Sequence, residues 1–263
     1  MRSALWILIL PALLAATPAV SEHRIDRSVQ QCLDENPELR VGIACAREGE
    51  RQWRDVLKEI DLQLRTMLPT DLHPLLADYV QAWTDHRQTV AILNQTVGNR
   101  AQEFSDGAMW TMFMHAMNEL QDVRFEVEAR QNLTRGELPT ATTDEPGPSE
   151  PLEPFYAALK QALGPDHVQT VDAANAAWEA YRDKRILLWG ETLAKSGDPA
   201  WKSSMQADLH RDWAAYLRSL IADLADAGLG EAMPLPWSSR LNSRLSGRLE
   251  AGETQPTPSS ICL

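Results

Sequence analysis

The fold of this chain is decided by residues 76–97, which have the sequence LADYVQAWTDHRQTVAILNQTV. Large apolar and aromatic side chains recur there at alternating steps of three and four residues, which places them on one stripe of an α-helix. The members of the stripe are Leu76, Tyr79, Trp83, His86, Val90, Leu93 and Val97. Such a helix must bury its stripe against other helices, so this segment predicts a helical bundle.

Three further stripes with the same spacing extend the prediction along the chain. They are Met109, Phe113, Ala116, Leu120, Val123 and Val127, then Val171, Ala174, Trp178, Tyr181 and Leu188, then Leu209, Trp213, Leu217, Leu220 and Leu224. We find no run that alternates apolar and polar side chains in the manner of a β-strand. The predicted fold class is therefore all-α.

The two halves of the chain resemble each other at a constant offset of 95 residues. This shift places Leu64 on Leu159, Leu68 on Leu163, Trp83 on Trp178, Arg87 on Arg182, Leu93 on Leu188 and His115 on His210. Each half is expected to form a helix, a short turn, a long helix bearing the Trp, a loop and a closing helix. Two related antiparallel helical units therefore follow from the pattern.

The N-terminus has the pattern of a secretory signal peptide. Arg2 precedes an apolar run and a stretch of small residues around Ala19, which is typical of a cleaved signal. An uncleaved anchor is the alternative, but the run is shorter than the about 20 apolar residues that span a bilayer. We predict a signal peptide over 1–21, no transmembrane segment after its removal, and a periplasmic or secreted protein.

Proline content divides the rest of the chain. A helical domain is expected over 22–131 and a second repeat over 155–227, and between them 132–154 contains five prolines, which favour an extended linker. The tail over 228–263 also contains prolines. Its arginines at 240, 244 and 248 alternate with leucines, so that part is either a docked surface helix or an interaction or membrane-surface peptide.

Two of the three cysteines predict a disulfide. Cys32 and Cys45 lie close together in a chain that is expected to be exported, and the segment between them contains Pro37 and Gly42, which allow it to turn back. We predict the pair Cys32–Cys45 and treat Cys262 as a spare thiol. Pairing of Cys262 with either of the other two stays open.

The composition favours a binding protein over an enzyme. The formal net charge of −12 argues against a nucleic-acid partner and permits a basic protein partner. The six histidines are scattered, and the pair His115 and Glu119 supplies two metal ligands where a site needs three or four. No hydrolase elbow or phosphate-binding glycine loop is present, so we expect neither catalysis, nor a cofactor, nor a metal.

Several early residues form a recognisable set, which consists of Cys32, Gly-Ile-Ala-Cys-Ala over 42–46, leucines near four-residue spacing, and Gln-Ala-Trp over 81–83 followed by Arg87. This set resembles the LprI-like lysozyme-inhibitor domain family. The second half matches at Ala-Trp-Glu-Ala-Tyr-Arg-Asp over 177–183 but lacks the paired cysteines. The first half has Gln88 where the family usually has Asp. The resemblance implies an exported helical protein, and some family members inhibit lysozyme.

These observations lead to one main hypothesis and two alternatives. The main hypothesis is a binding protein that blocks the cleft of a basic lysozyme, with Asp144, Glu145 and Glu150 of the linker as candidate contacts. The alternatives are an envelope scaffold or interaction module of the same fold that binds another envelope protein, and a helical domain that binds a small ligand or metal between its halves.

The two Trp and Arg pairs are expected to have a structural role. An Arg one helical turn after a Trp can stack over the ring while its guanidinium binds a carboxylate or a helix carbonyl. We therefore expect Trp83 with Arg87, and Trp178 with Arg182, to pack and orient helices.

Overall fold

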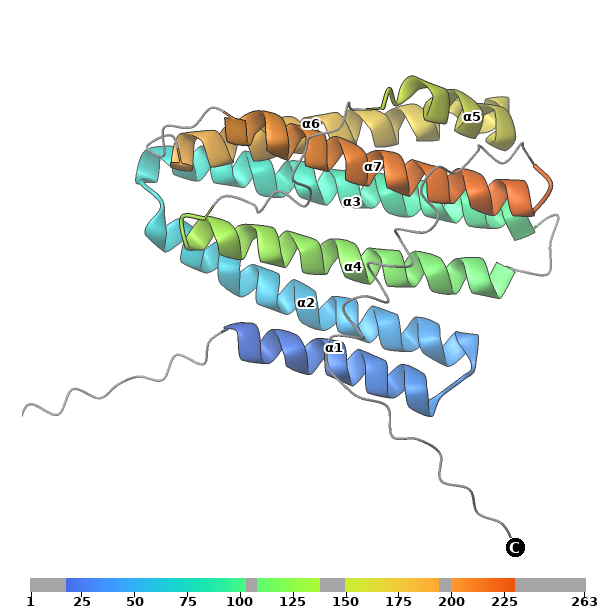
Figure 1. Ribbon diagram of the computed structural model, residues 1–263, viewed down its shortest axis with the longest axis horizontal. Coiled ribbons are helices and arrows are strands. Elements are labelled where there is room, and N and C mark those ends of the chain that lie inside the picture. The colour runs from blue at the N-terminus through green and yellow to red at the C-terminus, as the bar shows by residue number, and fades with distance from the viewer. Residues whose placement is uncertain (1–17, 103–107, 138–149, 194–199, 230–263) are drawn as a thin grey trace, which may run out of the picture.

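The computed structural model describes residues 18–102, 108–137, 150–193 and 200–229, and these form an all-α bundle (Figure 1). The α-helices are α1 (Pro18–Glu35), α2 (Leu39–Met67), α3 (His73–Gln102), α4 (Ala108–Thr134), α5 (Glu153–Leu163), α6 (Val168–Leu193) and α7 (Ala200–Asp226). Short 3₁₀ turns, η1 (Thr70–Leu72) and η2 (Pro165–His167), precede α3 and α6. The all-α prediction is confirmed. Among the described residues, no helix combines the length and the apolar character that crossing a bilayer requires.

The helices are stacked in the order α1, α2 with α4, α3, then α6 and α7 with α5 outermost (Figure 1). α2 and α4 run in the same direction. Gly42 lies against Phe113 near one end of the pair, and Asp61 bonds Arg130 toward the other end. A Cβ at Gly42 would lie 2.9 Å from a ring carbon of Phe113. This glycine therefore allows the two parallel helices to approach closely.

The disulfide between Cys32 and Cys45 joins α1 to α2, with 5.9 Å between the two Cα atoms. The predicted pairing is confirmed. The predicted turn is only partly right, since residues 36–38 make it and Gly42 lies inside α2. At that position the small side chain serves helix packing and not chain reversal.

The internal repeat appears in the helix boundaries. η1 and η2 begin at Thr70 and Pro165, and α3 and α6 begin at His73 and Val168, so both pairs are offset by 95 residues. The predicted order of helix, turn, long helix and closing helix is present in both halves. The first half has α1 in addition, and α2 is much longer than its counterpart α5.

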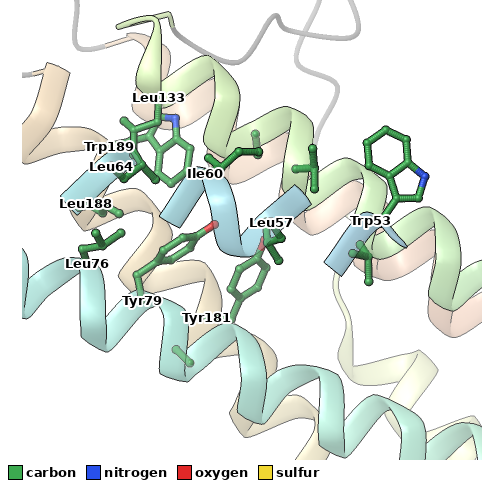
Figure 2. Close-up of a cluster of buried hydrophobic side chains, with 14 of the residues drawn as sticks. Trp53, Leu57, Ile60, Leu64, Leu76, Tyr79, Leu133, Tyr181, Leu188 and Trp189 are labelled. Atoms are coloured by element: carbon green, nitrogen blue, oxygen red, sulfur yellow. The ribbon is translucent and has the colours of Figure 1, made fainter. Parts of the chain in front are cut away.

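The two hydrophobic cores do not coincide with the two repeats. The first core joins α1–α4 to the second part of α6, through Tyr181, Leu188 and Trp189 (Figure 2), and to the first part of α7, through Met205. The second core joins α5–α7 to the second part of α3, through Val90, Leu93 and Val97. Each long helix therefore completes the core of the other repeat, and the halves pack as one body.

The helices on either side of the predicted linker extend a few residues into it. α4 continues to Thr134 and α5 begins at Glu153, with Pro154 in its first turn. Proline is tolerated there because the first N–H groups of a helix have no intrahelical acceptor. Residues 138–149 lie outside the described residues, as do 1–17 of the predicted signal and 230–263 of the tail.

Candidate binding surface

In the first repeat the Trp and Arg pair fastens three helices together. The Arg87 guanidinium lies 5.9 Å from the ring centroid of Trp83. It donates to the carboxylate of Glu50 on α2 at 2.5 Å and to the carbonyl oxygen of Glu119 on α4 at 2.8 Å. Only 11% of the Arg87 side chain is exposed. The geometry is that of a packing device.

In the second repeat the equivalent pair stacks but makes fewer bonds. The Arg182 guanidinium lies 4.9 Å from the ring centroid of Trp178, which is buried. Among the described residues, Arg182 donates a hydrogen bond only to the adjacent Asp183, at 2.8 Å. Trp178 is also stacked on Trp213 of α7, with 5.8 Å between ring centroids. Aromatic packing thus takes the place of the ion pair.

A buried polar network fills the junction between the two repeats. Glu126 of α4 accepts hydrogen bonds from the hydroxyls of Tyr79 and Tyr181 and from Arg130 Nε, the last two at 2.7 Å. Arg130, which is fully buried, also bonds Asp61 of α2. The sequence alone does not reveal this network, because its members come from four helices.

Two arginines keep the buried carboxylate charged. Burial alone would raise the pKa of Glu126, but the nearby guanidinium groups of Arg130 and Arg185 hold it below its usual value. Burial also raises the pKa of Tyr181 well above its usual value, so this hydroxyl stays protonated and donates. The network is therefore a fixed set of charges between α2, α3, α4 and α6.

His86 and Tyr181 are equivalent residues of the two repeats, and they stack directly on each other. Their ring centroids are 5.3 Å apart and their planes differ by 1°. Burial lowers the pKa of His86 to about 4, and the Arg87 charge adds to the effect. The imidazole is therefore neutral at neutral pH, and the space between the halves at this point is filled by protein side chains.

The residues weighed as metal ligands are not gathered into a site. His115 Nε2 lies 3.3 Å from the Asp223 carboxylate of α7. Within the described ranges, no three His, Cys, Asp or Glu side chains are grouped in a way that would hold a metal ion.

Of the three linker residues predicted to contact a partner, only Glu150 lies within the described residues. Its carboxylate bonds Arg218 of α7, and its carbonyl oxygen lies 2.5 Å from His210 Nε2. Asp144 and Glu145 lie outside the described residues. The Glu150 charge is thus already engaged within the chain.

The outward stripes of α3 and α6, with the turns before them, form a surface that we call the acidic face. Its exposed carboxylates are Asp71, Asp78, Asp85, Asp166, Asp172, Glu179, Asp183 and Glu191. The stripes meet where Lys184 of α6 bonds Asp78 of α3 at 2.6 Å. Asp71, Asp85, Asp166, Glu179 and Glu191 form no ion pair with a described residue.

No described Lys or Arg of α3 or α6 is fully exposed, and Lys160 of α5 is paired with Asp172 at 2.5 Å. Lys184 and Arg182 are paired with carboxylates, and Arg185 points toward buried Glu126. An exposed apolar residue lies on each stripe, Ile92 with 54% and Leu187 with 47% of its surface accessible. These two residues are also offset by 95, so they occupy equivalent positions in the two repeats.

No family model and no curated protein matches this sequence. A solved structure that is similar is that of an uncharacterized protein from Burkholderia thailandensis, with a TM-score of 0.57 and 20% identity. The match covers 75% of this chain and 96% of that chain. At this identity the likeness concerns the fold alone.

Proposed function

We propose that this protein is an exported binding module whose acidic face engages a basic protein, and that the partner is a basic lysozyme whose cleft is blocked by the contact. The observation that carries the proposal is the set of eight exposed carboxylates on α3, α6 and the preceding turns, with no fully exposed Lys or Arg on those helices. The sequence resemblance to lysozyme inhibitors supplies the choice of partner.

The mechanism requires only charge complementarity and surface contact. A surface of one sign attracts a partner of the opposite sign and raises the association rate, most strongly at low salt. Ile92 and Leu187 add apolar contact area on the same stripes. An inhibitor of this kind excludes the polysaccharide substrate from the cleft and needs no catalytic group of its own.

The test is inhibition of lysozyme-catalysed lysis of bacterial cell walls by the mature, disulfide-intact protein. Stoichiometric inhibition that weakens as salt rises is the expected result. The double variant Asp85→Lys with Glu179→Lys, at central positions of the two stripes, should slow association at low salt by about tenfold or more. The control variant Glu59→Lys with Asp226→Lys removes the same charge elsewhere and should inhibit like the parent.

Equal loss in both variants would show that net charge alone matters and would refute the acidic face as the contact. No inhibition of any lysozyme would instead favour the scaffold or interaction module, for which the equivalent positions of Ile92 and Leu187 would offer one contact in each repeat.

A further inference from the structure

A second surface, unlike the acidic face, lies where α2 and α4 begin. An open concavity of about 620 Å³ is formed there, with Arg40, Ile43 and Arg47 of α2 on one side and Met109 and Met112 of α4 on the other. Its volume falls within the range of small-molecule sites.

Among the described residues, no carboxylate forms an ion pair with Arg40 or Arg47 of this concavity. Glu48 at its edge is bonded by Arg51 at 2.6 Å, and the hydrogen bond from Arg51 lowers the pKa of Glu48 to about 2. Arg40 and Arg47 are exposed, lie two helical turns apart on the same stripe, and form no ion pair with a described residue. Two guanidinium groups are therefore free to bind an anion in a protein of net charge −12.

The direction of the helices favours an anion at the same end. α2 and α4 are parallel, and both begin at this concavity, at Leu39 and Ala108. The first N–H groups of each helix lack intrahelical acceptors and carry partial positive charge. This effect adds to that of the arginines.

The other half of the concavity is apolar. Ile43 is only 6% exposed and forms its floor, while Met112 is 38% exposed at its edge. Met109 is half-buried against the first core. Methionine side chains are flexible and polarizable, so they adapt to an alkyl chain of varied shape.

We propose that this concavity binds a single-chain anionic amphiphile. Its carboxylate is held by Arg40 and Arg47, and its alkyl chain lies over Ile43, Met109 and Met112. The two arginines complement the charged end of such a molecule, and the apolar floor complements its alkyl chain. A free anion lacks the alkyl chain, and an uncharged lipid lacks the charge. This site shares no residue with the acidic face, so it does not depend on the lysozyme proposal.

The test is calorimetric titration of the mature protein with decanoate, with acetate as a headgroup alone and octyl glucoside below its micelle-forming concentration as an uncharged amphiphile. One saturable site for decanoate is expected, with acetate and octyl glucoside at least about tenfold weaker. Absence of a saturable site for decanoate, or equal affinity for octyl glucoside, would overturn the proposal.

Matched variants locate the site. Arg40→Gln with Arg47→Gln should weaken decanoate binding by at least about tenfold, because charge-assisted hydrogen bonds to both groups are lost. Arg24→Gln with Arg27→Gln removes the same charge from exposed positions of α1 and should leave binding unchanged. A similar loss in both variants would mean general charge attraction and would refute the site.

Two further variants test the contact with the alkyl chain and the independence of this site from the acidic face. Met112→Gln should weaken decanoate binding by about threefold while acetate binding is unchanged, since only alkyl contact is removed. Asp85→Lys with Glu179→Lys should bind decanoate like the parent, and a loss there would contradict the separation of the two surfaces. Circular dichroism and thermal unfolding establish that each variant is folded.

Discussion

Arg87 in the first repeat and Arg182 in the second stand at equivalent positions, each stacked on a Trp one turn earlier, yet they act differently. Arg87 reaches Glu50 on α2 and the Glu119 carbonyl on α4, whereas within the described part of the chain Arg182 bonds only its neighbour Asp183. The difference follows from the preceding helix. α2 has 29 residues and α5 has 11, and the position equivalent to Glu50 at the offset of 95 falls before α5, outside the described residues.

The polar network shows the same divergence. Glu126 and Arg130 of the first repeat correspond, at the offset of 95, to Ile221 and Ala225 of the second. One repeat thus has a buried ion pair where the other has apolar side chains. The repeated motif fixes the stacking of an Arg on the Trp one helical turn earlier. The surrounding helices determine which hydrogen bonds the Arg can form.

The largest expected effect comes from removing Arg130. Arg130→Ala should lower the free energy of unfolding by about 3 to 5 kcal/mol, because Glu126 and Asp61 lose their buried partner. Urea unfolding measures the change. Arg135→Ala, an exposed arginine just beyond α4, is the control and should cost less than about 0.5 kcal/mol. Similar values for both would show that the network adds little stability.

The second effect concerns the disulfide, which the second repeat lacks. Cys32→Ala with Cys45→Ala should lower the free energy of unfolding by about 3 kcal/mol, because the unfolded chain regains the freedom of a short loop. Reduction of the parent protein should give a comparable loss in the same urea titration. If neither treatment changes the midpoint, the link between α1 and α2 is not stabilising.

The third effect tests the stack between His86 and Tyr181. The pKa of His86 is about 4 when folded against a usual value of 6.5, so between these values the unfolded state binds more protons. The contribution of neutral His86 to the free energy of unfolding is fully present above pH 6.5, and it is lost as the pH falls toward 4. The loss should be about 2 to 3 kcal/mol at pH 4.5.

His86→Phe keeps the stack without the titrating group, and is the matched control for this pH effect. The difference in unfolding free energy between pH 7 and pH 4.5 should be smaller in the variant than in the parent protein by that amount. Identical pH profiles for the two proteins would mean that His86 is accessible to protons in the folded state.

The smallest effect separates the two arginines directly. Arg87→Ala should cost about 2 kcal/mol, because a charge-assisted hydrogen bond to half-buried Glu50 is lost. Arg182→Ala should cost less than about 1 kcal/mol, since it loses one stack and one exposed bond. Equal costs in thermal or urea unfolding would contradict the difference between the repeats.

Several features could be predicted from the sequence because they depend on local order. The apolar stripes became the buried faces of α3, α4, α6 and α7, with Leu93, Val123, Leu188 and Leu217 fully buried. The cystine was predictable from proximity along the chain, and the offset of 95 anticipated the placement of both 3₁₀ turns. α1 was not predicted, since its apolar stripe is narrow and overlaps the expected signal peptide.

The candidate surfaces were not predictable in the same way. Asp85 and Glu179 belong to one face only because α3 and α6 lie side by side, and Arg47 meets Met112 only because α2 and α4 begin at the same end. Of the linker residues chosen for their charge, Glu150 is bonded to Arg218, and Asp144 and Glu145 lie outside the described residues.

By itself the sequence determined the helical class, the repeat and the cystine, because side-chain period and short separations in the chain dictate them. Only the tertiary structure decided that each long helix completes the core of the opposite repeat. It also placed Glu126 between two tyrosines and two arginines, and it divided the surface into an acidic face and a basic concavity. These features depend on contacts between residues far apart in the chain, which the order of residues does not specify locally.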